Sequence, residues 1–271
     1  RRLRSNIKKS NAFYIFVAMF IDLLQLPELS VYQWSLLMVC GLLVGMGKTG
    51  VAGAGMLIVP ILAAVFGGKN SAGLLLPMLA MADIFAVIYY NRHAEWKYVF
   101  RLLPSTMAGI GLGIYVGEIV NDEQFKVIMA TIIIISLGIM IWREKYGNGQ
   151  NIPDKWWFSA AFGLAGGFST MIGNAAGPVM AVYLLSMRLP KNSYIGTGAW
   201  FFLIVNYAKI PFHILIWETI DWNSFSINLL TLPAILIGAV AGVKIIGYIP
   251  ERAYRIFIIV MTAIASIRLF F

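Results

Sequence analysis

The amino-acid sequence predicts an all-α polytopic membrane protein with two homologous halves. Of its 271 residues, 60% are hydrophobic and only 12% are charged, whereas a soluble domain is about 45–50% apolar and about 25% charged. Apolar segments of roughly 20 residues, the length that a helix needs to cross a bilayer, follow one another along the chain. The order of these segments, and several residues within them, recurs in the second half.

The predicted membrane segments come in the same order in both halves. Each half begins with an overlong apolar segment that is interrupted by glycine, and three ordinary spans follow it. The first half contains the segments 34–66, 72–90, 99–117 and 125–142. The second half contains the segments 156–187, 193–217, 225–248 and 254–271. We expect helix in each span, because a helix satisfies its backbone polar groups internally within lipid.

The domain organisation follows from this order. Residues 34–146 form the first transmembrane repeat, residues 147–155 a polar linker, and residues 156–271 the second repeat. Residues 1–33 form a basic N-terminus with an apolar run at 12–26. That run is either an interfacial helix or a short first span, and the sequence leaves both alternatives open.

Specific residues support an internal duplication. Lys69-Asn70-Ser71 recurs 122 positions later as Lys191-Asn192-Ser193. Four further matches follow in the same order: Trp96 with Trp222, Pro104 with Pro233, Gly109 with Gly238, and Gly113 with Gly242. Duplicated halves, often of inverted topology, are a common construction of transporters.

Loop charge predicts the orientation of the halves. Basic residues form four clusters: Arg92, Lys97 and Arg101; Arg143, Lys145 and Lys155; Arg188 and Lys191; and Arg252 and Arg255. Acidic residues gather elsewhere, at Glu118, Asp122 and Glu123 and at Glu218 and Asp221. Placing the basic clusters in the cytoplasm makes the second broken segment a re-entrant hairpin. If the first broken segment behaves likewise, the halves are inverted repeats, although Lys69 then lies outside and counts against this topology.

The formal net charge of +9 is also explained by the basic residues of cytoplasmic loops. Lysine and arginine in cytoplasmic loops fix the topology of a membrane protein, so no nucleic-acid partner is predicted. The expected partners are membrane lipid and a small inorganic or organic anion. The sequence leaves the oligomeric state open.

The two glycine-rich breaks are the candidate substrate site. Dense glycine destabilises helix, and unwound backbone survives in a membrane only where protein or a water-filled cavity satisfies it. The N–H groups of a helix that starts after such a break are suited to an anion. The predicted substrate-binding residues are Lys48, Thr49, Gly50, Gly53 and Gly55 in the first break and Ser169, Thr170, Asn174 and Gly177 in the second.

Ionisable residues within spans are costly and usually functional. Asp83 lies in the span 72–90, and Asn206, Lys209 and His213 lie in the span 193–217. We predict that these four residues supply coupling or counter-charge. Asp83 would either pair with a lysine or carry a coupling proton. The alternatives are a structural ion pair for Asp83 and, for Lys209 and His213, extension of the side chain to the interface.

Two other patterns have structural interpretations. The spaced glycines of the plain spans predict close helix packing: Gly109, Gly113 and Gly117, and Gly238 and Gly242. The tryptophans at span ends predict an interfacial belt: Trp96, Trp142, Trp156, Trp157, Trp217 and Trp222.

A family resemblance rests on motifs in both halves. In the first half they are the run Gly50-Val51-Ala52-Gly53-Ala54-Gly55 through Pro60, then Ala82-Asp83, Trp96 and Leu103-Pro104; in the second they are Gly196-Thr197-Gly198 and Asp221-Trp222. With these motifs the chain resembles the TauE/SafE family of sulfite exporter-like permeases from about residue 34 to its end. Asn174-Ala175-Ala176-Gly177 is less glycine-rich than the first break, so the halves could contribute unequally.

The resemblance implies a multi-pass protein of a bacterial or archaeal cytoplasmic membrane. It also implies a secondary transporter, often an exporter, of a small anion such as sulfite, thiosulfate or an organosulfonate like sulfoacetate. Proton coupling is an open option. An anion channel is the alternative, and an intramembrane enzyme is a remote one, since the chain has no His-Glu-x-x-His or Gly-x-Ser-x-Gly motif. No catalytic residue, metal ligand or cofactor is predicted.

Overall fold

The computed structural model describes residues 27–49, 54–146, 156–187 and 189–245, together with residues 260, 263, 264 and 267. The predictions for the N-terminal run 12–26, for Gly50 and Gly53, for the linker 147–155 and for most of the last span lie outside these residues.

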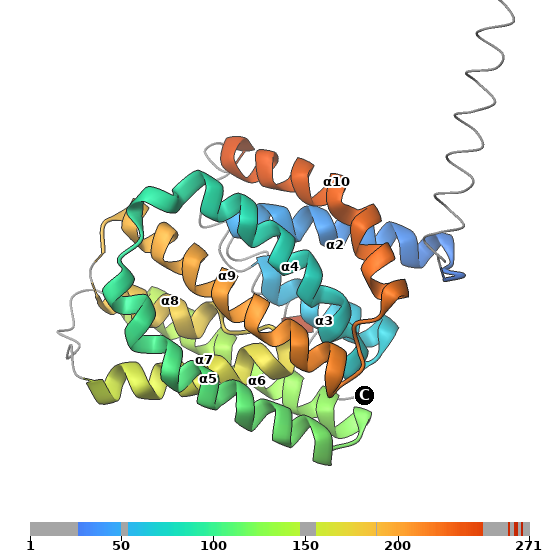
Figure 1. Cartoon of the computed structure of the whole chain (residues 1–271), viewed down its shortest axis with the longest axis horizontal. Coiled ribbons are helices and arrows are strands. Elements are labelled where there is room, and N and C mark those ends of the chain that lie inside the picture. The colour runs from blue at the N-terminus through green and yellow to red at the C-terminus, as the bar shows by residue number, and fades with distance from the viewer. Residues whose placement is uncertain are drawn as a thin grey trace, which may run out of the picture.

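The described residues form a helical bundle (Figure 1). The helices of the first half are α2 (Val31–Thr49), α3 (Ala54–Phe66), α4 (Gly68–Tyr90), α5 (Trp96–Ile119) and α6 (Asp122–Tyr146), with a short 3-10 helix, η1 (Asn91–His93), before α5. Those of the second half are α7 (Trp156–Gly173), α8 (Gly177–Ser186), α9 (Lys191–Leu215) and α10 (Trp222–Ile245). Within the described ranges, five helices are long and apolar enough to cross a membrane: α2, α4, α5, α9 and α10. The prediction of an all-α multi-pass membrane protein is confirmed.

The two halves interlock instead of lying side by side. The most extensive helix contacts pair α5 of the first half with α7 of the second, and α2 of the first half with α10 of the second. Helices α4 and α9 pack against each other between these outer pairs (Figure 1). Each half therefore completes its packing only in the presence of the other.

Helices α4 and α9 run antiparallel. Gly73, near the start of α4, lies against Thr219, which follows the end of α9. Gly196, near the start of α9, lies against the backbone of Tyr90 at the end of α4. Inverted repeats require this arrangement of the corresponding helices, and the inversion of the complete halves stays a prediction.

Glycine permits the close approach of the outer helix pairs. A Cβ atom at Gly109 of α5 or Gly238 of α10 would collide with the backbone of α7 or α2, respectively. One at Gly113 would meet Met171 of α7, and one at Gly242 would meet the backbone and side chains of α2. The prediction that these glycines serve helix packing is confirmed. Gly117 differs, because its neighbour is the indole ring of Trp217.

The helix breaks are shorter than the glycine pattern predicts. Helix α2 continues to Thr49, and Gly45 within it lies against the backbone of α10. Helix α7 continues to Gly173, and Gly167 within it lies against Thr106 of α5. These glycines serve helix packing and not the break. The second break comprises only residues 174–176, where Asn174 adopts a positive φ of 50°.

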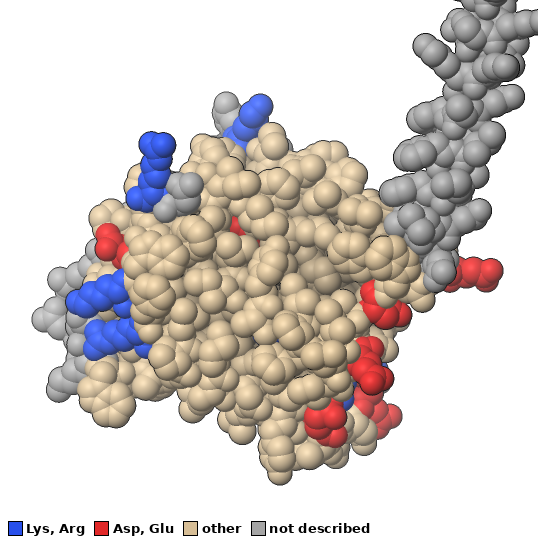
Figure 2. Space-filling view, in the orientation of Figure 1, with Lys and Arg blue, Asp and Glu red and all other residues tan. Residues whose placement is uncertain are grey.

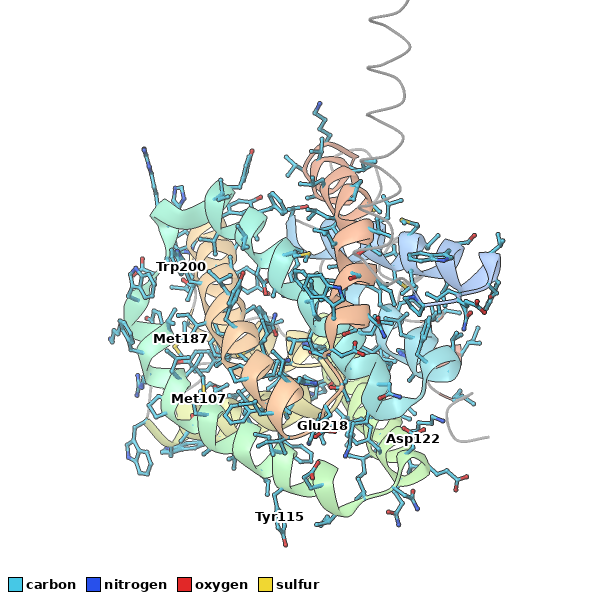
Figure 3. All side chains as sticks on the ribbon, turned by 45° about the vertical axis from the view of Figure 1, so that its right-hand side comes forward. Met107, Tyr115, Asp122, Met187, Trp200 and Glu218 are labelled. Atoms are coloured by element: carbon cyan, nitrogen blue, oxygen red, sulfur yellow. The ribbon has the colours of Figure 1, made fainter. Side chains whose placement is uncertain are left out.

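Charged residues gather at two opposite ends of the molecule (Figure 2). Most of the visible lysine and arginine side chains lie at the left and top of this view, most of the aspartate and glutamate side chains lie at the right, and a broad uncharged surface separates them. Asp122 and Glu218 lie at the same end (Figure 3), which we call the acidic end. Lys69 also lies there, paired with Glu118 at 3.3 Å. The separation agrees with membrane helices that run between a basic and an acidic face.

Five of the six tryptophans predicted to form an interfacial belt have the exposure that a belt requires. Trp96, Trp142, Trp156, Trp157 and Trp222 are each at least 40% exposed, as lipid-interface residues should be. Trp217 is only 5% exposed, so its assignment to the belt is wrong. The reason is that the chain after α9 folds back into the bundle and takes the indole with it.

Candidate functional site

A row of polar side chains lies on one face of α9. Asn206, Lys209 and His213 are three and four positions apart, a spacing that places them on the same side of a helix, and all three are fully buried. The alternative in which Lys209 and His213 extend to the interface is therefore wrong. Buried polar groups in a membrane protein must find partners inside the bundle, and the partners come from α4, from α7 with the second break, and from Thr219 after α9.

Asp83 of α4 is the buried carboxylate of this site. Its Oδ1 atom lies 2.7 Å from Lys48 Nζ at the end of α2, and its Oδ2 atom accepts a hydrogen bond of 2.6 Å from Asn206 Nδ2. The carboxylate is fully buried, whereas the Lys48 side chain is 17% exposed. A buried carboxylate is tolerated when it is both paired and hydrogen-bonded, and Asp83 meets both conditions.

Lys209 connects α9 to the last turn of α7 and to the second break. Its Nζ atom donates hydrogen bonds to Thr170 O at 2.9 Å, to Thr170 Oγ1 at 3.0 Å and to Asn174 Oδ1 at 2.6 Å. Asn174 in turn donates from Nδ2 to Ala72 O of α4 at 3.1 Å. Asparagine tolerates the left-handed conformation that ends α7, and the turn directs its amide to both neighbouring helices.

The electrostatics of the site favour an anion. In their charged forms Lys48, Asp83 and Lys209 sum to one excess positive charge. The carboxylate is paired with Lys48, while the three hydrogen-bond partners of Lys209 are neutral oxygens. A small anion could replace these neutral partners and balance the buried ammonium, because a buried charge is most stable when paired.

The structure brings some of the predicted site residues together and separates others. Six of them form the two adjacent groups described above, Lys48–Asp83–Asn206 and Lys209–Thr170–Asn174, which meet on the polar face of α9 and which we call the polar network. The Thr49 hydroxyl instead donates to Ala239 O of α10 at 2.9 Å. Ser169 donates to Ala165 O within its own helix at 2.7 Å, and Gly55 and Gly177 have open space around them.

Sequence reasoning missed three neighbours of this network. The Phe202 ring lies beneath Lys48, with 4.4 Å between Nζ and the ring centroid. Phe202 lies one turn before Asn206 on the same helical face, and this spacing could have predicted that its ring lies beside the polar side chains. The Thr219 hydroxyl lies 2.8 Å from His213 Nδ1, and the Trp217 ring lies 4.9 Å from the His213 ring. The pattern of a loop after a span gives no sign of these two contacts.

Comparisons with known proteins identify the family. No curated protein and no solved structure shows significant similarity to the chain. The family model described as "Sulfite exporter TauE/SafE" matches residues 37–269, which covers both halves and every residue of the polar network. The chain therefore belongs to the TauE/SafE sulfite exporter family, which is a family of membrane transporters.

Proposed function

We propose that this protein is a secondary transporter that exports a small sulfur-containing anion, such as sulfite, thiosulfate or sulfoacetate. The observation that carries the proposal is the polar face of α9, where Asn206 bonds to the Lys48–Asp83 ion pair and Lys209 bonds only to neutral oxygens of α7 and the second break. Family membership supports the sulfur chemistry. The charge separation supports a cytoplasmic membrane location with the basic end inside.

The donors of the network suit an oxyanion. Lys48 and Lys209 supply ammonium groups, Asn206 supplies an amide N–H, and Thr170 supplies a hydroxyl. An anion with several oxygens can accept from donors that come from different directions, and charge-assisted hydrogen bonds of this kind are the strong ones. Organosulfonates and sulfite share this array of sulfur-bound oxygens.

Asp83 could couple anion transport to proton binding. In the present arrangement its carboxylate holds Lys48 at 2.7 Å, so it occupies the place that a substrate anion would take. A proton on Asp83 would neutralise the carboxylate and free Lys48 to bind the substrate. Anion binding and proton binding would then favour each other by mutual linkage. The two ions would cross the membrane together, so net export would require an outward anion gradient that exceeds the inward proton gradient.

Burial of the central side chains of the network favours a carrier over a channel. Asp83, Lys209 and His213 are fully buried and in direct contact with protein groups. A carrier passes through such occluded arrangements, whereas an open anion channel needs a continuous wet path past these side chains. Saturable flux is the corresponding kinetic expectation.

Flux into proteoliposomes tests the proposal. Purified protein would be assayed with sulfite, thiosulfate, sulfate, sulfoacetate and lactate, each with and without a proton gradient. We expect saturable flux of one sulfur anion that the gradient accelerates, and loss of the acceleration in the Asp83→Asn variant. Transport of lactate with no flux of any sulfur anion would refute the substrate, and flux that does not saturate would refute the carrier.

A further inference from the structure

The connection between α9 and α10, residues 216–221, folds back into the acidic end of the bundle. The backbone N–H groups of Thr219 and Ile220 donate to His213 O at 2.9 and 3.3 Å. Glu218 adopts a positive φ of 51°, a conformation that is uncommon for a side chain of this size. The turn leaves Trp217 and Ile220 buried, so these residues cover the acidic end of the polar face of α9.

Trp217 lies where four helices meet. Lys69 of α4 lies 5.4 Å from the centroid of its ring, and the ring of Phe125 of α6 lies 5.5 Å away in an edge-to-face contact. Gly117 of α5 lies against the indole ring, where a larger residue would collide with it. His213 of α9 completes the surroundings at 4.9 Å between ring centroids. An indole in this position separates the acidic surface from the polar network.

Two buried hydrogen-bonding atoms of this cluster are unused. His213 Nε2 and Trp217 Nε1 are buried, and neither has a hydrogen-bond partner among the described residues. The indole Nε1–H is always a donor. When the Thr219 hydroxyl donates to His213 Nδ1, the imidazole hydrogen resides on Nε2, so Nε2–H is a second donor. Buried groups of this kind normally have a partner, which points to a ligand that brings an acceptor.

The charges around His213 and Trp217 indicate which kind of ligand would bind to these two nitrogen atoms. Lys209 lies one helical turn before His213, and Lys69 lies over the face of Trp217. Lys69 is itself paired with Glu118, so Lys209 supplies the uncompensated positive charge. Two N–H donors beside an ammonium group suit an anion and not a cation.

We propose that His213 and Trp217 form an outer anion subsite between Lys209 and the acidic end, closed from that side by residues 216–221. The inference rests on the proposed transport function and adds a second anion-binding position to the transport path. The anion passes from Lys209 to the two N–H donors and leaves when the 216–221 segment moves outward. Because the segment is bonded to the His213 carbonyl and ring, occupancy of the subsite and movement of the segment are mechanically linked.

Indole nitrogen NMR tests the subsite directly. The full chain, labelled with ¹⁵N at tryptophan Nε1, would be placed in lipid nanodiscs and titrated with sulfite, thiosulfate, sulfoacetate or lactate. The Trp217 resonance is identified by its loss in the Trp217→Phe variant, which keeps an aromatic ring. We expect this resonance to shift in a saturable manner, while the exposed Trp157 resonance stays in place.

Affinity measurements separate the subsite from the transport function. Trp217→Phe and His213→Gln should each weaken binding of the transported anion about 10- to 100-fold, the usual range for loss of one hydrogen bond to a charged partner. Trp157→Phe is the matched control and should leave the affinity unchanged. The subsite would be overturned if an anion is transported, leaves the Trp217 resonance in place and binds to both variants as tightly as to wild type. That result would leave the proposed transport function intact. A Trp217 shift with lactate alone would support the subsite and refute the sulfur substrate.

Discussion

The outer helix pairs and the central pair differ in how much the two halves resemble each other. The α2–α10 and α5–α7 contacts follow one plan, in which glycines of each helix lie against the backbone of its partner. Gly41 and Gly45 of α2 correspond to Gly163 and Gly167 of α7, each pair 122 positions apart. The central helices do not match in this way: at the same spacing of 122 positions Asp83 of α4 corresponds to Val205, and Asn206 and Lys209 of α9 correspond to Ile84 and Val87.

The outer helix pairs serve packing, whereas the central pair supplies the charged and polar residues of the site. A close helix contact accepts almost nothing larger than glycine, so both copies of the outer contact have the same small residues. The central helices contribute opposite charges to one site, with the carboxylate on α4 and the unpaired ammonium on α9. The two halves therefore contribute unequally to this site, with the carboxylate from the first half and Lys209 from the second.

The largest expected effect comes from breaking the central ion pair. Asp83→Ala leaves Lys48 without its carboxylate in a mostly buried position, and loss of one partner of a buried pair costs about 3–5 kcal/mol. We expect this loss in the free energy of unfolding in detergent, together with loss of transport. The Lys48→Met/Asp83→Leu double variant should recover most of the stability and none of the transport. A double variant as unstable as the single one would contradict a paired role for the two residues.

The outer contacts should respond to a single added methyl group. Gly109→Ala and Gly238→Ala each place a Cβ against the backbone of the partner helix, and overpacking of this kind costs about 1–3 kcal/mol. Gly111→Ala is the matched control, because open space surrounds Gly111 on the same helix as Gly109. That variant should be neutral or gain up to about 1 kcal/mol from helix propensity. Equal melting temperatures for Gly109→Ala and Gly111→Ala would contradict the packing account.

The smallest expected effect concerns Asp122 at the acidic end. Its Oδ1 atom accepts from the N–H groups of Gly68 and Lys69 at the start of α4, and its Oδ2 atom lies 2.8 Å from Lys126 Nζ. Partial burial raises the pKa of this carboxyl, but the Lys126 and backbone hydrogen bonds outweigh it and hold the pKa below its ordinary value of 3.8. The lowered pKa means that the ionised form stabilises the folded protein.

Acid should therefore remove the contribution of Asp122. The stabilisation by ionised Asp122 is fully present above the pKa that this carboxyl has in the unfolded chain. It is lost as the pH falls below about 4 and through the lower pKa of the folded protein. We expect Asp122→Ala to lower stability by up to about 1 kcal/mol at pH 6, because the side chain is half exposed. The difference from wild type should shrink as the pH approaches 3, whereas exposed Glu123→Ala should show little difference at any pH. A constant Asp122→Ala deficit across this range would speak against the carboxylate as its source.

Much of the fold could be predicted because lipid imposes simple rules. Spans, short loops and the glycine contacts of α5 and α10 follow from hydrophobic length and residue size. The pairing of Asp83 with a lysine was one of the two roles predicted for it, since a carboxylate within a span needs a partner. The choice between Lys48 and Lys209 was not predictable, because it depends on the depth at which α2 ends.

The remaining errors have one cause, which is that local sequence does not report tertiary neighbours. Gly45 and Gly167 belong to glycine-rich runs but lie within packed helices. Trp217 has the pattern of an interfacial residue, yet the turn at Glu218 buries it. Thr49 lies beside Lys48 in sequence, but its hydroxyl faces α10. Each of these outcomes depends on a residue from the other half of the chain.

Binding of the transported sulfur anion to the Lys209→Gln variant tests the central claim most directly. The measurement would compare wild type, Lys209→Gln and Lys244→Gln in nanodiscs, using the ³⁵S-labelled anion. Lys244 is exposed at the end of α10 and is the matched control for loss of one lysine charge. A buried charged hydrogen bond of about 1.5–3 kcal/mol predicts affinity about 10- to 100-fold weaker for Lys209→Gln, with Lys244→Gln unchanged. A correctly folded Lys209→Gln protein that binds the anion as tightly as wild type would contradict the account.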